Sequence, residues 1–110
     1  MNASNIRRLL TQEIHSLLFT TNVAGYREEV VNPHITDTAI LCGSFNPLHE
    51  GHIELLDHGQ FKSGKLHKLF ELSVVNCDKG ALEEKDIMKR VVQFERDGLN
   101  LLLTTQPYFY

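Results

Sequence analysis

The chain contains few cysteines, has no excess of positive charge and lacks a long apolar run. Its two cysteines, Cys42 and Cys77, are too few for a disulfide framework or a four-ligand zinc site. We interpret both as small buried side chains near the ends of strands. The formal net charge of −3 provides no general basic field, so nucleic acid is not an expected partner. No apolar segment approaches the length that crosses a bilayer, so no membrane partner is expected.

The N-terminal segment also lacks the apolar core of a secretory signal peptide, because Arg7, Arg8, Gln12 and Glu13 interrupt it. Hydrophobic residues make up 42% of the 110 residues and charged residues 23%, which is typical of a globular protein. This length allows one domain at most. Composition and N-terminal segment together predict a cytoplasmic protein.

The first third of the chain predicts a helix followed by a connecting segment. Apolar residues recur at helical spacing over residues 4–19, which predicts an amphipathic helix. Residues 20–37 contain several asparagine, glycine and proline residues and are interpreted as a linker. We therefore expect an N-terminal helix and linker over residues 1–37 and a partial α/β domain over residues 38–110.

The rest of the chain alternates between predicted strands and helices. Strands are predicted at residues 38–42, 66–76 and 99–104, and the first and third are almost wholly apolar, as in a buried parallel sheet. Helices are predicted between them, at residues 50–60 and 83–97. This β-α-β-α-β order is typical of a Rossmann-like parallel sheet, in which ligands bind beyond the carboxyl ends of the strands. Three strands make a thin sheet, so the domain is expected to be truncated.

The most informative segment is residues 40–52, Ile-Leu-Cys-Gly-Ser-Phe-Asn-Pro-Leu-His-Glu-Gly-His. A strand runs into the turn at Gly43 and Ser44, an Asn-Pro kink follows, and then a helix begins. Glycine lets the backbone approach an anion closely, and the free N–H groups of a helix N-terminus attract one. His49 and His52 lie one helical turn apart at this end and can face the same ligand. The segment therefore predicts a phosphate-binding site.

This segment resembles the HxGH nucleotidyltransferase superfamily, which comprises adenylyl- and cytidylyltransferases, and the resemblance covers residues 38–110. The pairing of Asn46 with His49 is closest to the nicotinamide- and nicotinate-mononucleotide adenylyltransferases of NAD biosynthesis. The resemblance implies transfer of a nucleotidyl group from a nucleoside triphosphate, ATP rather than CTP, to a phosphorylated small molecule, with release of pyrophosphate. It also implies Mg²⁺ that accompanies the nucleotide and is held largely by the phosphates, with no dedicated protein metal site.

The resemblance also assigns roles to the residues of the motif. His52 is expected to contact the phosphates most directly, and His49 is expected to shape and charge the same pocket. These two histidines are the expected catalytic residues. The residues expected to bind the nucleotide and its phosphates are Gly43, Ser44, Phe45, Asn46 and Gly51.

Polar residues follow the next two predicted strands at the same edge of the sheet as the motif. Asn76, Asp78 and Lys79 follow the second strand, and Thr104 ends the third. By resemblance and by position they are candidates for contacting the acceptor or a phosphate. Asn76, Asp78 and Lys79 equally fit a solvated turn, and both interpretations stay open.

The chain lacks the family's second signature, a serine-rich segment that ends in arginine or lysine and binds the triphosphate from the other side. One expectation is therefore an enzyme that a second copy or a missing C-terminal half completes. The alternative is a truncated, non-catalytic nucleotide-binding or interaction fragment. A third hypothesis is a small α/β protein whose open sheet edge drives oligomerisation.

Overall fold

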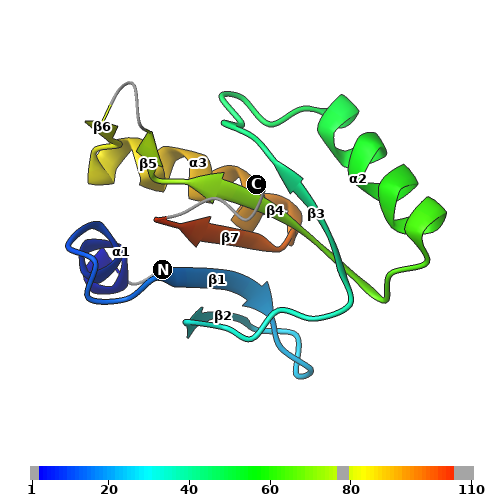
Figure 1. The fold of residues 1–110 in the computed structure, drawn as a ribbon, viewed down its shortest axis with the longest axis horizontal. Coiled ribbons are helices and arrows are strands. Elements are labelled where there is room, and N and C mark those ends of the chain that lie inside the picture. Colours follow the sequence, from blue (N-terminus) through cyan, green and yellow to red (C-terminus); the bar gives the residue numbers. More distant parts are fainter. Residues whose placement is uncertain (1–2, 77–79, 106–110) are drawn as a thin grey trace.

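The computed structural model describes residues 3–76 and 80–105, which form a five-stranded mixed sheet and three helices (Figure 1). The helices are α1 (Ala3–Leu10), α2 (Glu50–Ser63) and α3 (Glu84–Asp97). The strands of the sheet are β1 (Ser16–Thr21), β2 (Arg27–Val31), β3 (Thr38–Cys42), β4 (His67–Ser73) and β7 (Leu101–Thr104). A separate two-stranded ribbon pairs β5 (Val75–Asn76) with β6 (Gly80–Ala81).

The predicted alternation of strands and helices after residue 37 is confirmed. The sheet has the order β2-β1-β7-β4-β3, in which β3, β4 and β7 run parallel and are connected by α2 and α3. Gly64 (φ 69°) and Gly98 (φ 66°) end these helices in the left-handed conformation that glycine adopts without strain. The predicted helix at residues 50–60 extends to Ser63, and the predicted strand at residues 66–76 ends at Ser73, because Val75 and Asn76 pair with β6 in the separate ribbon.

The expected helix over residues 4–19 is wrong beyond residue 10. Helix α1 ends at Leu10, and Gln12 in the left-handed conformation (φ 63°) redirects the chain. Ser16–Thr21 form β1, in which Leu17 and Phe19 are buried at the two-residue spacing of a strand. A leucine-rich stretch fits both periodicities, and pairing of β1 with β7 decides between them.

The expected linker over residues 20–37 also contains a strand. The side chain of Asn22 accepts hydrogen bonds from the backbone N–H groups of Ala24 and Tyr26, and the turn leads into β2, antiparallel to β1. Arg27 then joins this hairpin to α3 through two hydrogen bonds of 3.0 Å to the carboxylate of Glu95. The sheet is therefore mixed rather than wholly parallel, and residues 16–31 share it with the rest of the chain.

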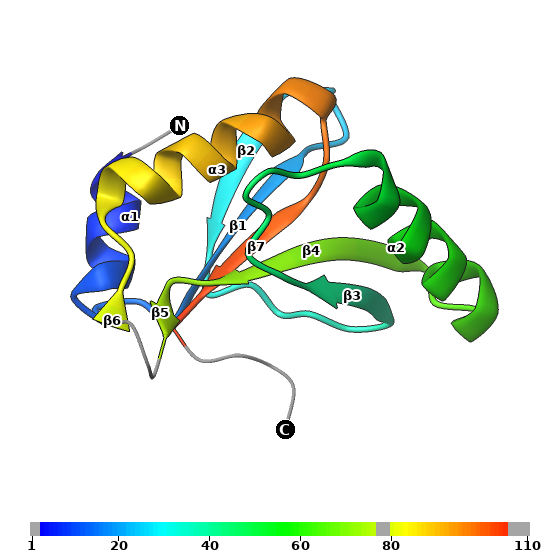
Figure 2. The same cartoon turned by 90° about the horizontal axis from the view of Figure 1, so that it is seen from above.

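All three helices pack on one face of the sheet (Figure 2). Phe70 of β4 and Leu103 of β7 contribute to a core shared with α1, α2 and α3. Their chain neighbours Glu71 and Leu102 point to the opposite face, where the ranges 3–76 and 80–105 contribute no helix. No helix within those ranges is long and apolar enough to cross a bilayer. Strand β3, which precedes the motif, forms one edge of the sheet and is only partly buried, so its expected burial is wrong.

Candidate functional site

His49 and His52 cap helix α2 reciprocally. His49 is the N-cap residue, and its Nδ1 accepts a hydrogen bond of 3.1 Å from the backbone N–H of Gly51. The backbone N–H of His49 donates to Nδ1 of His52, also over 3.1 Å. This is a capping box built from two imidazoles, in positions where a serine or threonine hydroxyl and a glutamate or glutamine usually act.

These hydrogen bonds define the tautomer of both neutral imidazoles. A ring nitrogen that accepts a hydrogen bond carries no proton, so the proton of each neutral ring is on Nε2. The two rings stack with their centroids 3.7 Å apart and an interplanar angle of 26°. His49 and His52 therefore present two Nε2–H donors from one stacked unit at the N-terminus of α2, beside its backbone N–H groups.

Phe45 connects the motif loop to the core. Its backbone has φ 48°, and its side chain is 1% exposed. The ring makes edge-to-face contacts with Phe70, Phe94 and His52, at centroid distances of 5.4, 5.3 and 5.1 Å. The histidine pair is thus supported directly by the aromatic core of the sheet and α3.

Gly43 and Gly51 leave the space that these rings occupy. A Cβ atom at Gly43 would lie 3.0 Å from two carbons of the Phe45 ring, and one at Gly51 would lie 3.0 Å from the His49 ring. Neither glycine has a positive φ. The close approach of an aromatic ring to each backbone therefore explains why glycine occupies both positions. Any side chain at these two positions must displace an aromatic ring of the site.

Gln93 of helix α3 forms hydrogen bonds to the backbone of the motif loop. The side-chain oxygen of Gln93 accepts from the backbone N–H of Leu48 over 2.7 Å, and its amide nitrogen donates to the carbonyl of Phe45 over 2.9 Å. The two bonds bridge the turn that contains the cis Asn46–Pro47 peptide bond. One side chain thereby satisfies backbone groups on both sides of the turn.

Arg90, one helical turn before Gln93, also contacts the loop. Its Nε donates to the carbonyl of Ser44 over 3.0 Å, and its Nη1 donates to the carbonyl of Asp86 over 3.1 Å. Sequence reasoning missed both Arg90 and Gln93. Their three-residue spacing on a helix was the only available signal, and polar residues have that spacing on most helices.

The structure brings the predicted phosphate-binding residues together after the carboxyl end of β3. The exposed members are Gly43, Ser44, Asn46, His49 and Gly51, and His52 is half-buried between them and the core. Phe45 is buried, so its ring supports the loop and does not face solvent. Backbone groups and the two imidazoles form the accessible part of the site.

Of the other predicted contact residues, Thr104 is not part of this surface. Thr104 is 1% exposed and lies on β7, separated from β3 by β4, and its hydroxyl donates to the carboxylate of Glu71. Asn76 lies in β5, whereas Asp78 and Lys79 fall outside the described residues. The described contacts of Thr104 are therefore with the sheet and not with the motif loop.

Glu71 is a buried carboxylate that sequence reasoning missed. It is 1% exposed and lies on β4, paired with Cys42 of β3. Partial burial of the thiol and, to a smaller extent, the negative charge of Glu71 raise the pKa of Cys42 to about 11, so it stays protonated at neutral pH. Cys42 as a residue is exposed, so its expected burial is wrong, and Cys77 falls outside the described ranges.

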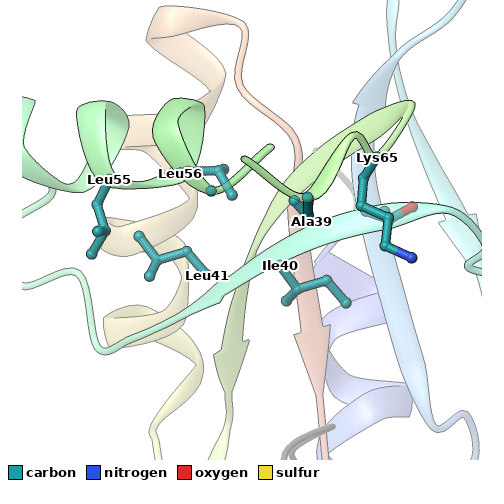
Figure 3. Close-up of a pocket in the computed structure, with 9 residues that line it drawn as sticks. Ala39, Ile40, Leu41, Leu55, Leu56 and Lys65 are labelled. Carbon is teal, nitrogen blue, oxygen red and sulfur yellow. The ribbon is translucent and has the colours of Figure 1, made fainter. Parts of the chain in front are cut away.

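A separate apolar groove of about 430 Å³ lies between α2 and the edge strand β3 (Figure 3). Leu41, Leu55 and Leu56 are among the residues that line it, and Lys65 is the one charged residue among them. Neither histidine of the motif lines this groove. The groove is therefore a separate site from the one that the histidine pair forms.

No group of three or more histidine, cysteine, aspartate or glutamate side chains in residues 3–76 and 80–105 is placed to hold a metal ion. The chain matches no family model, and the comparisons find no matching curated protein or solved structure. The function therefore has to be inferred from the chemistry of the site itself.

We expect the cap of α2 to weaken as the pH falls. Burial and, second, the neighbouring His49 lower the pKa of His52 below 6.5. The unfolded chain therefore takes up this proton first, so this contribution to stability is fully present above about pH 6.5 and is lost as the pH falls below 6.5 and through the lowered pKa of His52. Urea unfolding between about pH 5 and about pH 8 measures the effect.

The variant His52→Asn is the control for this pH dependence. Its side-chain oxygen can replace Nδ1 as the acceptor for the backbone N–H of His49 and does not titrate. The free energy of unfolding of this variant should therefore lack the part of the pH dependence that protonation of His52 causes. Identical pH profiles of the variant and the unmodified chain would contradict the assignment.

Proposed function

We propose that the chain is a nucleotidyltransferase-type domain that binds a nucleoside triphosphate, ATP in preference to CTP, and transfers its nucleotidyl group to a phosphorylated small molecule. The observation that carries this proposal is the reciprocal cap of His49 and His52 on α2. It leaves two Nε2–H donors at a helix N-terminus, beside the exposed turn at Gly43 and Ser44. Anions bind where backbone and side-chain N–H groups converge in this way.

The position of the site in the fold supports the same proposal. The motif loop follows the carboxyl end of β3, where ligands bind in parallel α/β sheets. The parallel strands β3, β4 and β7 are adjacent and are joined by helices, which supports the Rossmann-like half-sheet that the proposal assumes. The resemblance of the motif to the HxGH nucleotidyltransferases gives the reaction class.

In the proposed reaction, an oxygen of the acceptor phosphate attacks the α-phosphorus of the nucleotide. A new P–O bond forms while the bond to the β-phosphate breaks, and the electron pair of the broken bond stays on pyrophosphate. The Nε2–H groups of His49 and His52 would donate to the oxygens on which negative charge increases, without transferring a proton. Each hydrogen bond to a charged oxygen contributes about 1.5–3 kcal/mol. Mg²⁺ would arrive with the nucleotide and bind its phosphate oxygens.

A ¹⁵N–¹H NMR titration with Mg–ATP and then Mg–CTP tests the binding part of the proposal. We expect chemical-shift changes to concentrate on residues 43–52 and to be larger for ATP at equal concentration. His58, an exposed histidine on the same helix, gives the control variant His58→Asn, which should bind like the unmodified chain. A well-dispersed spectrum that neither nucleotide changes would overturn the proposal.

Release of pyrophosphate in the presence of a panel of phosphorylated acceptors tests the catalytic part. Turnover that requires both an acceptor and His52 supports a transferase. Nucleotide binding at residues 43–52 with no turnover for any acceptor supports the alternative, a non-catalytic nucleotide-binding domain. The absence of the family's second signature favours that alternative, whereas the intact first motif favours the enzyme.

A further inference from the structure

The histidine pair, as the structure describes it, provides hydrogen-bond donors but no formal positive charge. Both Nδ1 atoms accept hydrogen bonds, so both imidazoles are in the neutral form. A nucleoside triphosphate carries several negative charges, and a neutral donor compensates them less well than a cation does. A protein cation close to the motif loop would therefore add charge compensation to that of the Mg²⁺ that arrives with the nucleotide.

Arg90 is a cation that contacts this loop directly. Its Nε is 3.0 Å from the carbonyl oxygen of Ser44, an exposed loop residue next to Gly43. Its Nη1 bonds the carbonyl of Asp86, so two backbone oxygens orient the guanidinium plane. Backbone carbonyls orient this charge without neutralising it.

The guanidinium of Arg90 keeps part of its binding capacity free. No carboxylate within residues 3–76 and 80–105 forms an ion pair with Arg90, in contrast to Arg27, whose Nε and Nη2 both bind Glu95. In Arg90, Nε–H donates to Ser44 and Nη1 donates to Asp86, whereas Nη2 has no hydrogen-bond partner within the same ranges. The two N–H groups of Nη2 are therefore free to donate to an oxygen of an anionic ligand such as a phosphate.

We propose that Arg90 binds the β- and γ-phosphates of the nucleotide, and that helix α3 thereby supplies the cation of the triphosphate site. This inference rests on the proposed function and adds a ligand-contacting residue to it. Support of the loop does not by itself explain an arginine here, because Gln93 already bridges Phe45 and Leu48 across the turn. The assignment also accounts for triphosphate binding in a chain without the later serine-rich, basic segment.

The test compares binding of Mg–ATP and of AMP by the unmodified chain and by Arg90→Gln, Arg90→Lys and Lys89→Gln. Lys89 precedes Arg90 on α3 and is exposed, so its variant controls for loss of a positive charge from this helix. We expect Arg90→Gln to weaken Mg–ATP binding by about 10- to 100-fold and AMP binding by less than about 3-fold. Arg90→Lys should keep most of the ATP preference, because it keeps the charge, and Lys89→Gln should change neither affinity.

The ratio of the two affinities separates a phosphate contact from loop support. Arg90→Gln with equal losses for Mg–ATP and AMP, or with no loss, would overturn the inference while leaving the proposed function intact. An unmodified chain that does not bind Mg–ATP would overturn the proposed function and this inference with it. The amide signal of Ser44 in the NMR spectrum reports whether each variant keeps the loop conformation.

Discussion

His52→Asn is expected to lower the rate of nucleotidyl transfer by about 10- to 100-fold while the chain stays folded. Asparagine places its oxygen near the position of Nδ1, where it can still accept from the backbone N–H of His49. It has no group at the position of Nε2, so the donor to the phosphates is lost. Pyrophosphate release gives the rate, and urea unfolding gives the stability.

The complementary variant His52→Gln tests the donor role of this histidine. Glutamine extends its amide to the region of Nε2, and at this position of a capping box its side-chain oxygen can also accept from the backbone N–H of the N-cap residue. His52→Gln should therefore be about as stable as His52→Asn and more active, and His58→Asn should match the unmodified chain in both respects. Transfer at the unmodified rate by His52→Asn would remove His52 from the mechanism.

Phe45→Ala is expected to destabilise the fold by about 3–5 kcal/mol. The ring is 1% exposed and contacts Phe70, Phe94 and His52, so its removal leaves a cavity where β4, α3 and the motif loop meet. The loss is a large part of the stability of a domain of this size, about 5–15 kcal/mol. Urea unfolding of both proteins at one pH measures it.

Phe61→Ala is the matched control for this prediction. Phe61 lies on α2 and is 85% exposed, so removal of its ring should change the free energy of unfolding by less than about 0.5 kcal/mol. Phe45→Leu, which keeps most of the apolar volume, should cost about 1.5 kcal/mol or less. A destabilisation by Phe45→Ala of under about 1 kcal/mol would mean that the loop is not anchored in the core.

Local patterns were sufficient for the order of the main elements from β3 to β7. Short apolar runs indicate the strands at residues 38–42 and 99–104, and Gly98 marks the end of the helix before the last strand. These patterns do not show that β3 is a partly buried edge strand or that Val75 and Asn76 belong to a separate ribbon. The N-terminal third was different. Leu17, Leu18 and Phe19 satisfy a helical and a strand pattern alike, so their own spacing does not determine which one forms.

The motif residues could be predicted because they are close together in the sequence. The residues of α3 that contact the motif loop could not be predicted, because they are distant in the sequence. Gly43, His49 and His52 act within one turn and one helix N-terminus, so spacing alone indicates their common face. Gln93 and Arg90 reach the same loop from more than 40 positions away. Their contacts exist because α3 crosses the sheet beside the loop, which no short window of sequence encodes.

The sequence by itself determined the alternation of strands and helices after residue 37 and the grouping of the two histidines at a helix start. The physical reason is that periodicity, helix capping and glycine stops act over a few residues. Only the tertiary structure decided that residues 16–31 form an antiparallel hairpin, that Glu71 is buried, and that Arg90 lies against Ser44. These features depend on strand pairing and on helix packing between distant segments, where the free energy of burial outweighs local preference.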